Sequence, residues 1–123
     1  MENARSTQTE AFKKRLYSFT IGLIAFIDQL PKDNVSRRIG DQLLRSGTSV
    51  LANFVEGQSA SSRKDFANFF NHSLKSANES KIWLALLCDS KRVSAEKTRW
   101  YLNELEEFVK IFASSIITLR RKK

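Results

Sequence analysis

Residues 94–119 read SAEKTRWYLNELEEFVKIFASSIITL. Apolar side chains recur along this stretch in steps of three and four, at Leu102, Leu105, Val109, Phe112, Ile116 and Leu119. With about 3.6 residues per turn, an α-helix places side chains of this spacing on one face. Ser94 is a favourable N-cap residue for such a helix. The seven-residue period predicts that the helix packs against its neighbours at a crossing angle of about 20°.

Three earlier stretches keep the same period and are predicted to be helices over Thr9–Gln29, Val35–Glu56 and Ser62–Ser90. The first stripe contains Phe12, Leu16, Phe19, Leu23, Phe26 and Leu30, and it is widened by Tyr17, Ile24 and Ile27. The second stripe contains Ile39, Leu43, Ser46, Val50 and Asn53. The third stripe contains Phe66, Phe70, Ser73, Ala77, Ser80, Leu84 and Leu87.

Helix breakers and caps separate these stretches. Pro31 ends the first helix, because proline disfavours helical geometry in the residue before it. Gly57 is a helix stop, and Ser62 with Asp65 three residues later has the spacing of a capping box. The short connections predict an all-α fold, a left-handed up-down-up-down four-helix bundle.

Length and composition fit one such domain. The chain has 123 residues, 41% of them apolar, with only one Pro and four Gly, which is too little turn chemistry for a sandwich or barrel. We expect the bundle over residues 9–119, a flexible N-terminal tail over residues 1–8 and a basic C-terminal tail over residues 120–123.

The second helix carries small residues on and beside its stripe, at Gly40, Ser46, Gly47, Ser49 and Ala52. Each glycine costs a helix about 1 kcal/mol relative to alanine. Small side chains allow a neighbouring helix to approach closely, so we expect tight packing along this helix.

Other apolar side chains exceed what one small core can hold, namely Ile21, Trp83, Trp100, Tyr101, Phe108 and Ile111. An apolar strip on the outside of a soluble protein marks an interface, and we therefore expect self-association. The alternative is a broad core within one chain.

The residue inventory offers little for catalysis. Cys88 is the only cysteine, so no disulfide or multi-thiolate metal site can form within the chain, as suits a reducing cytoplasm. His72 is the only histidine, which excludes a His-pair zinc site or a di-iron bundle, and we interpret it as a packing residue or one at the rim of the core. We therefore expect no enzyme, cofactor or metal. The longest uncharged run, Leu16–Ile27, is too short to cross a membrane.

Two carboxylates near the centre of the chain are interpreted as structural. Glu56 is expected to bond the amides at the start of the third helix, and Glu79 is expected to pair with Arg45 or Gln42 on the second helix. An antiparallel hairpin separates Glu56 from Glu79 by about 25 Å along the bundle, so they cannot act on one substrate within a chain.

The segment between Leu30 and Leu87 resembles a known family. It contains the motif Arg-Ser-x-x-Ser-Val-x-Ala-Asn-Phe-Val-Glu-Gly at residues 45–57 and a Ser-x-x-Glu at residues 76–79. In these residues the chain resembles the bacterial four-helix bundle family first described from intervening sequences in large-subunit ribosomal RNA genes. The resemblance implies that the motif residues are structural; they are Arg45, Ser46, Asn53, Glu56, Gly57, Ser76 and Glu79.

The resemblance also implies a homo-oligomeric ring, commonly a pentamer, with no enzymatic activity. It implies a relationship to the accessory variability protein of diversity-generating retroelements, which binds a reverse transcriptase and nucleic acid through a basic surface. The expected partners are accordingly the chain itself, RNA or DNA, and a reverse transcriptase or another protein, without a membrane.

The topology sorts the charges by end of the bundle. Where the first helix starts and the fourth ends, nine cations face three carboxylates, a balance of +6, whereas seven cations face five carboxylates at the opposite end, a balance of +2. The nine cations are Lys13, Lys14, Arg15, Arg63, Lys64, Arg120, Arg121, Lys122 and Lys123. Such an excess attracts polyanions, and it predicts phosphate contacts to RNA or DNA with weak sequence selectivity.

A second interpretation stays open beside this one. Basic residues at a helix C-terminus also complement the helix dipole, and a terminal basic run can simply be solvated. The chain would then be a protein-interaction scaffold that binds no nucleic acid. This interpretation predicts that surface aromatic residues such as Trp100 and Tyr101 matter, and that partner binding survives high salt.

Overall fold

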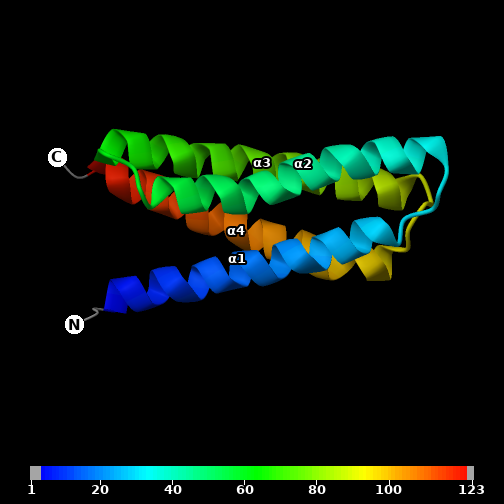
Figure 1. The fold of residues 1–123 in the computed structure, drawn as a ribbon, viewed down its shortest axis with the longest axis horizontal. Helices are drawn as coiled ribbons and strands as arrows, with labels where there is room; N and C mark the ends of the chain where they lie inside the picture. Colours follow the sequence, from blue (N-terminus) through cyan, green and yellow to red (C-terminus); the bar gives the residue numbers. More distant parts are fainter. Residues whose placement is uncertain (1–3, 122–123) are drawn as a thin grey trace.

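The computed structural model describes residues 4–121, which form α1 (Ala4–Asp28), α2 (Asn34–Gly57), α3 (Arg63–Asp89) and α4 (Ala95–Arg121). The helices run alternately up and down, so that the two ends of the chain lie at the same end of the bundle (Figure 1). α2 packs against α1 and α3, while α4 packs closely against α3 and only loosely against α1. α1 and α3 therefore lie diagonally across the bundle. The predicted all-α up-down four-helix bundle is confirmed.

Side-chain caps fix three of the helix starts. The Oγ of Ser62 accepts a hydrogen bond from the Asp65 amide at 3.1 Å, and the Oγ of Ser94 accepts one from the Lys97 amide at 3.2 Å, as predicted for both serines. The cap of α2 was not predicted. Asp33 accepts hydrogen bonds from the amide and hydroxyl of Ser36 at 2.9 and 2.7 Å, and these bonds lower its pKa to about 2.

Two helices are longer than the sequence patterns predicted. α1 begins at Ala4 and α4 continues to Arg121, so residues 4–8 and 120–121 are helical and do not form the expected tails. The physical reason is that neither stretch contains a proline or glycine to interrupt the backbone ladder. The remaining tail residues, 1–3 and 122–123, lie outside the described residues.

The predicted stripes form the core, with corrections at their edges. The centre of each stripe is buried, including Leu23 on α1, Leu43 on α2, Leu84 on α3 and Leu105 on α4. The expected widening of the first stripe is wrong at two positions, because Tyr17 is 59% exposed and Ile24 is 39% exposed. Phe108, expected among the surplus apolar residues, is fully buried.

The small residues of α2 permit the expected close packing on both sides. Gly47 faces α1 so closely that a Cβ added there would lie 2.2 Å from Cδ2 of Leu23. On the other side, Ser46 and Ser80 share a buried hydrogen bond between α2 and α3, with their Oγ atoms 2.7 Å apart. Ser73 on α3 donates to the backbone carbonyl of Val50 at 3.0 Å. At these positions of the α2–α3 seam, hydrogen bonds from serine hydroxyls replace apolar contacts between the helices.

Large apolar side chains also remain on the outside of the bundle. Those at least 39% exposed are Tyr17, Ile21, Ile24, Val35, Leu44, Val55, Ile82, Leu86, Trp100 and Ile117. Of the surplus residues identified in the sequence, Ile21 and Trp100 are exposed, whereas Trp83 and Tyr101 pack partly against the core. None of the helices within residues 4–121 combines the length and the hydropathy needed to cross a membrane.

Candidate nucleic-acid interface

Of the predicted basic residues, Arg63, Lys64, Arg120 and Arg121 lie at the end of the bundle where α1 and α3 start and α2 and α4 end (Figure 1). The expected place of Lys13, Lys14 and Arg15 at this end is wrong, because α1 begins at Ala4 and these residues therefore lie near its middle. Seven of the nine candidate residues are among those that the structure describes, and Lys122 and Lys123 lie outside them. All seven lie on three of the four helices, α1, α3 and α4, but they do not form one uniform surface. They divide into a shared groove, an ion-paired arginine and isolated exposed side chains.

The groove lies between the start of α3 and the end of α4. Arg63, Lys64 and Arg120 line it, and its volume is about 460 Å³. The three residues are exposed, and none of them forms an ion pair within residues 4–121. Asn68 adds an amide to the same wall. Three unpaired cations around one small groove can contact consecutive phosphates of a nucleic-acid backbone.

Arg15 does not belong to this set, which corrects the sequence interpretation. Its Nη2 and Nε donate to the two carboxylate oxygens of Glu104 on α4 at 2.6 and 3.1 Å. Its guanidinium also lies 5.2 Å from the centre of the Phe108 ring. The hydrogen bond with Glu104 raises the pKa of Arg15 above its ordinary value. Arg15 therefore joins α1 to α4 and does not present a free charge.

The other three described candidates are exposed but isolated. Lys13 and Lys14 lie on α1, diagonally opposite α3, and Arg121 is the last described residue of α4. None of the three forms an ion pair within the described part of the chain. Arg121 adds to the positive potential of the terminal end, whereas Lys13 and Lys14 lie near the middle of α1, and none of the three lines the groove.

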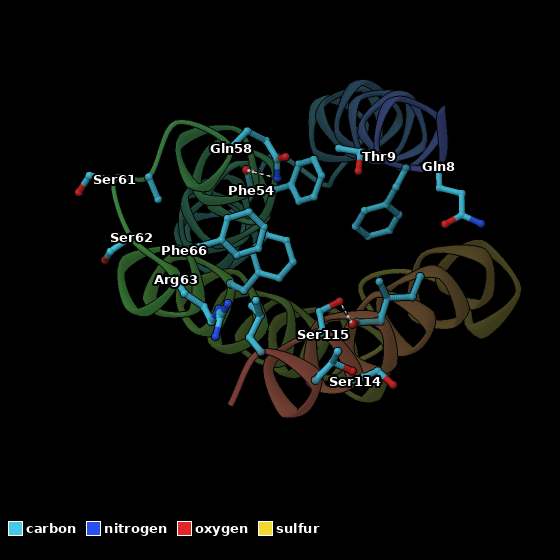
Figure 2. Close-up of a pocket in the computed structure, with 16 residues that line it drawn as sticks. Gln8, Thr9, Phe54, Gln58, Ser61, Ser62, Arg63, Phe66, Ser114 and Ser115 are labelled. Carbon is cyan, nitrogen blue, oxygen red and sulfur yellow. Dashed lines mark hydrogen bonds between the residues drawn. The ribbon is translucent and has the colours of Figure 1, made fainter. Parts of the chain in front are cut away.

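Sequence reasoning missed a larger cavity at the same end. It has a volume of about 860 Å³ and is bounded by residues from all four helices (Figure 2). It opens where α1 and α4 are only loosely packed. Arg63 and Leu119 line both this cavity and the groove. The apolar stripe of α4 continues unbroken to Leu119, so no local pattern in the sequence signalled this cavity.

The motif residues lie elsewhere, along the α2–α3 seam. Arg45 forms the predicted ion pair with Glu79 and also donates to the side chain of Gln42 at 3.0 Å. Glu79 accepts a further bond from the Trp83 indole at 3.0 Å. These contacts clamp α2 to α3.

A second motif cluster lies one to two turns further along the seam. The Oγ of Ser76 donates to the Oγ of Ser49 at 3.0 Å, and the side-chain amide of Asn53 donates to that same oxygen at 2.8 Å. Gly57 is buried at the end of α2, where an added Cβ would lie 3.1 Å from Cβ of Phe69. Motif residues of both clusters thus join helices.

The expected role of Glu56 is wrong. Its side chain is exposed and does not bond the amides of α3, because the Oγ of Ser62 already accepts the bond from the Asp65 amide. His72 is exposed on α3 and Cys88 is a half-buried free thiol. Within residues 4–121, no group of three or more His, Cys, Asp and Glu residues is placed to hold a metal ion.

Comparisons with known proteins agree with this architecture. The family model of the 23S rRNA-intervening sequence protein matches residues 9–114. A crystal structure from Bacteroides thetaiotaomicron, of a protein of unknown function from the S23 ribosomal protein family, is 34% identical, with a TM-score of 0.79. The match covers 85% of this chain and 96% of that one. A comparison with curated proteins finds no match. The chain belongs to the 23S rRNA-intervening sequence protein family.

Proposed function

We propose that this protein binds the phosphate backbone of RNA or DNA, as a homo-oligomer and without catalysis, through the groove of Arg63, Lys64 and Arg120. The observation that carries the proposal is that these three exposed cations line one groove and have no carboxylate partner among residues 4–121. Arg121, the next residue along α4 after Arg120, strengthens the positive potential beside the groove. Because every contact is to phosphate, binding depends steeply on salt and weakly on sequence.

The test is fluorescence anisotropy with a single-stranded RNA over a salt series, with light scattering on the same sample. The test variant combines Arg63→Gln, Lys64→Gln and Arg120→Gln. A matched control combines Arg37→Gln, Lys97→Gln and Arg99→Gln at the opposite end, where the side chains are also exposed and outside the ion pairs of the described chain. Both variants lose the same net charge.

Loss of three phosphate contacts should reduce the slope of log affinity against log salt by about 2 for a single strand, in the groove variant only. Equal losses in the two variants would mean that net charge alone attracts the RNA. No binding by the wild type at low salt would refute the proposal.

Two apolar patches support the oligomeric part of the proposal. Tyr17, Ile21 and Ile24 are exposed on α1, and Trp100, also exposed, lies on α4 beside Gly22 of α1. We name these four residues the α1 patch. Ile82 and Leu86 are exposed one helical turn apart on α3, and we name them the α3 patch. Because α1 and α3 are diagonal, the two patches face away from each other. Contact between unlike patches of neighbouring copies generates a ring when the rotation closes.

The second candidate function is a protein-interaction scaffold, which the same exposed apolar residues favour. Trp100 is 51% exposed and can contact a partner, whereas the expected contribution of Tyr101 is reduced because its hydroxyl donates to the Gly22 carbonyl at 3.0 Å. A scaffold would bind its protein partner at high salt and would be indifferent to the groove variant. The RNA salt series therefore distinguishes the two functions.

A further inference from the structure

We infer that the cavity at the terminal end of the bundle receives an unpaired nucleobase, while the adjoining groove holds the phosphates of the same strand. The inference rests on the proposed function and deepens it, because it names the substrate class as single-stranded or locally unpaired nucleic acid. It is carried by the shape, lining and charge of the cavity and by its continuity with the groove.

The floor of the cavity is aromatic. Phe12, Phe54, Phe66 and Phe70 line it, from α1, α2 and α3. Phe54 and Phe70 are buried beneath the surface, whereas Phe12 and Phe66 are only partly buried and line the cavity. Figure 2 shows Phe66 directed toward the space between the helix ends. A partly buried ring supported by fully packed rings is a rigid platform on which a base can stack.

The rings support one another closely. The centroids of Phe66 and Phe70 are 4.4 Å apart, and those of Phe12 and Phe54 are 5.3 Å apart. Phe54 lies 5.5 Å from Phe70 and joins the two pairs. The platform is therefore organised before any ligand enters, which lowers the conformational entropy that binding has to overcome.

The rim of the cavity is polar and uncharged apart from Arg63. The polar, uncharged residues that line it are Gln8, Thr9, Gln58, Ser61, Ser62, Ser114, Ser115 and Thr118. The side chains of Ser61 and Ser62 are directed away from the cavity (Figure 2), and the hydroxyl of Ser115 donates to the Ile111 carbonyl at 2.8 Å. Hydroxyl and amide groups both donate and accept hydrogen bonds, so together they can satisfy the edge of any base. This combination matches a planar apolar ring with polar edges, and it predicts little selectivity among bases.

Charge decides between a nucleotide and other aromatic ligands. Among the residues that line the cavity, none is acidic, and the only cation is Arg63. Arg63 also lines the groove, where Lys64 and Arg120 add two more cations. A ligand with an aromatic body and an anionic chain fits both spaces at once. In a duplex the bases are stacked and paired, so only an unpaired strand can supply this ligand without the cost of base flipping.

The experiment compares two short strands with equal numbers of phosphates. One is a thymidine oligonucleotide, and the other has the same backbone without bases. The wild type should bind the abasic strand roughly 5- to 150-fold more weakly, because a stacked base is lost, while the salt dependence stays the same.

Two variants test the cavity, each with a matched control. Phe66→Leu removes the stacking ring, and Phe69→Leu makes the same change on the same helix outside the cavity. Thr118→Trp fills the cavity from an exposed position. Ile117→Trp places the same new side chain at an exposed neighbouring residue that does not line the cavity. Thr118→Trp keeps the test valid if Phe66→Leu folds poorly. Both cavity variants should bind the thymidine strand as weakly as the abasic strand, and both controls should bind like the wild type.

The outcomes distinguish failure of the base-binding cavity from failure of the proposed function. Equal affinity of the wild type for the thymidine and abasic strands, with salt-dependent binding retained, would overturn the base-binding cavity and leave the backbone groove intact. The same conclusion would follow if Thr118→Trp bound the thymidine strand like the wild type. Absence of binding to every strand at low salt would overturn the proposed function itself.

Discussion

The Oγ atoms of Ser46 on α2 and Ser80 on α3 lie 2.7 Å apart, and both side chains are fully buried. Each hydroxyl also has a backbone acceptor on its own helix, the Leu43 carbonyl at 3.4 Å for Ser46 and the Ser76 carbonyl at 2.9 Å for Ser80. The pair therefore satisfies both hydroxyls at a point where the two helices leave no room for larger side chains.

This pairing predicts a non-additive effect of substitution. Ser46→Ala or Ser80→Ala should each lower the free energy of unfolding by about 1 kcal/mol, since one buried hydrogen bond is lost. The double variant should be less destabilised than the sum of the two. Urea unfolding at one fixed protein concentration measures all three. Strict additivity would show that the shared hydrogen bond contributes nothing.

Two glycines should respond in opposite ways to alanine. At Gly47 an added Cβ would lie 2.2 Å from Cδ2 of the buried Leu23, so overpacking of about 1–3 kcal/mol outweighs the gain in helix propensity. At Gly22 the nearest atom, the Tyr101 hydroxyl, is 3.5 Å from the added Cβ, so Gly22→Ala should stabilise α1 by about 0.5–1 kcal/mol. Thermal unfolding of the two variants is the measurement. A Gly47→Ala protein as stable as Gly22→Ala would contradict the close approach of α1 and α2.

Arg15 should contribute to stability and not to RNA binding. Arg15→Gln leaves Glu104 without its ion-pair partner, and the Glu104 side chain is only 17% exposed. The substitution should lower the free energy of unfolding by about 1 kcal/mol, a value that allows for the partial exposure of the pair. Its effect on RNA affinity should be smaller than that of Arg63→Gln, although both changes remove one positive charge. Anisotropy and urea unfolding of the two variants measure this contrast. An equal loss of RNA affinity in the two variants would show that Arg15 is part of the binding surface.

Acid should weaken the start of α2. The pKa of Asp33 is lowered to about 2 chiefly by the hydrogen bond from the Ser36 amide, so between about pH 4 and pH 2 the unfolded chain binds more protons at this residue than the folded protein. The stability that the cap supplies is therefore present above about pH 4 and is lost as the pH falls through about 2. Asp33→Asn keeps a good N-cap that does not titrate. The midpoint temperature of thermal unfolding should therefore depend less on pH in this variant than in the wild type over the same range. An unchanged pH profile would contradict the prediction.

The two apolar patches predict a heterologous interface. Ile21→Glu in the α1 patch and Ile82→Glu in the α3 patch should each reduce the oligomer to monomers, because each places a charge in a buried contact. A mixture of the two variants should form heterodimers, since each retains the patch that the other lacks. Light scattering of the separate and mixed samples measures this. If the mixed variants do not associate, contact between like patches of neighbouring copies is favoured instead.

Local sequence chemistry determined most of the architecture. The seven-residue stripes, Pro31, and the caps at Ser62 and Ser94 specify four helices and their order, because periodicity, proline geometry and capping act within a few residues. The contact between Arg45 and Glu79 could also be predicted, since an antiparallel hairpin brings these two positions level.

Tertiary structure decided the rest, through the rotation of each helix about its axis and the spacing between helices. Rotation of α1 exposes Tyr17, and the packing of α4 buries Phe108, although both lie at the edges of apolar stripes. The pairing of Arg15 with Glu104 joins residues 89 positions apart, which no local pattern reveals. The aromatic cavity exists only because α1 and α4 pack loosely at the terminal end. Its place beside the groove of Arg63, Lys64 and Arg120 therefore follows from the spacing of whole helices and not from any stretch of the sequence.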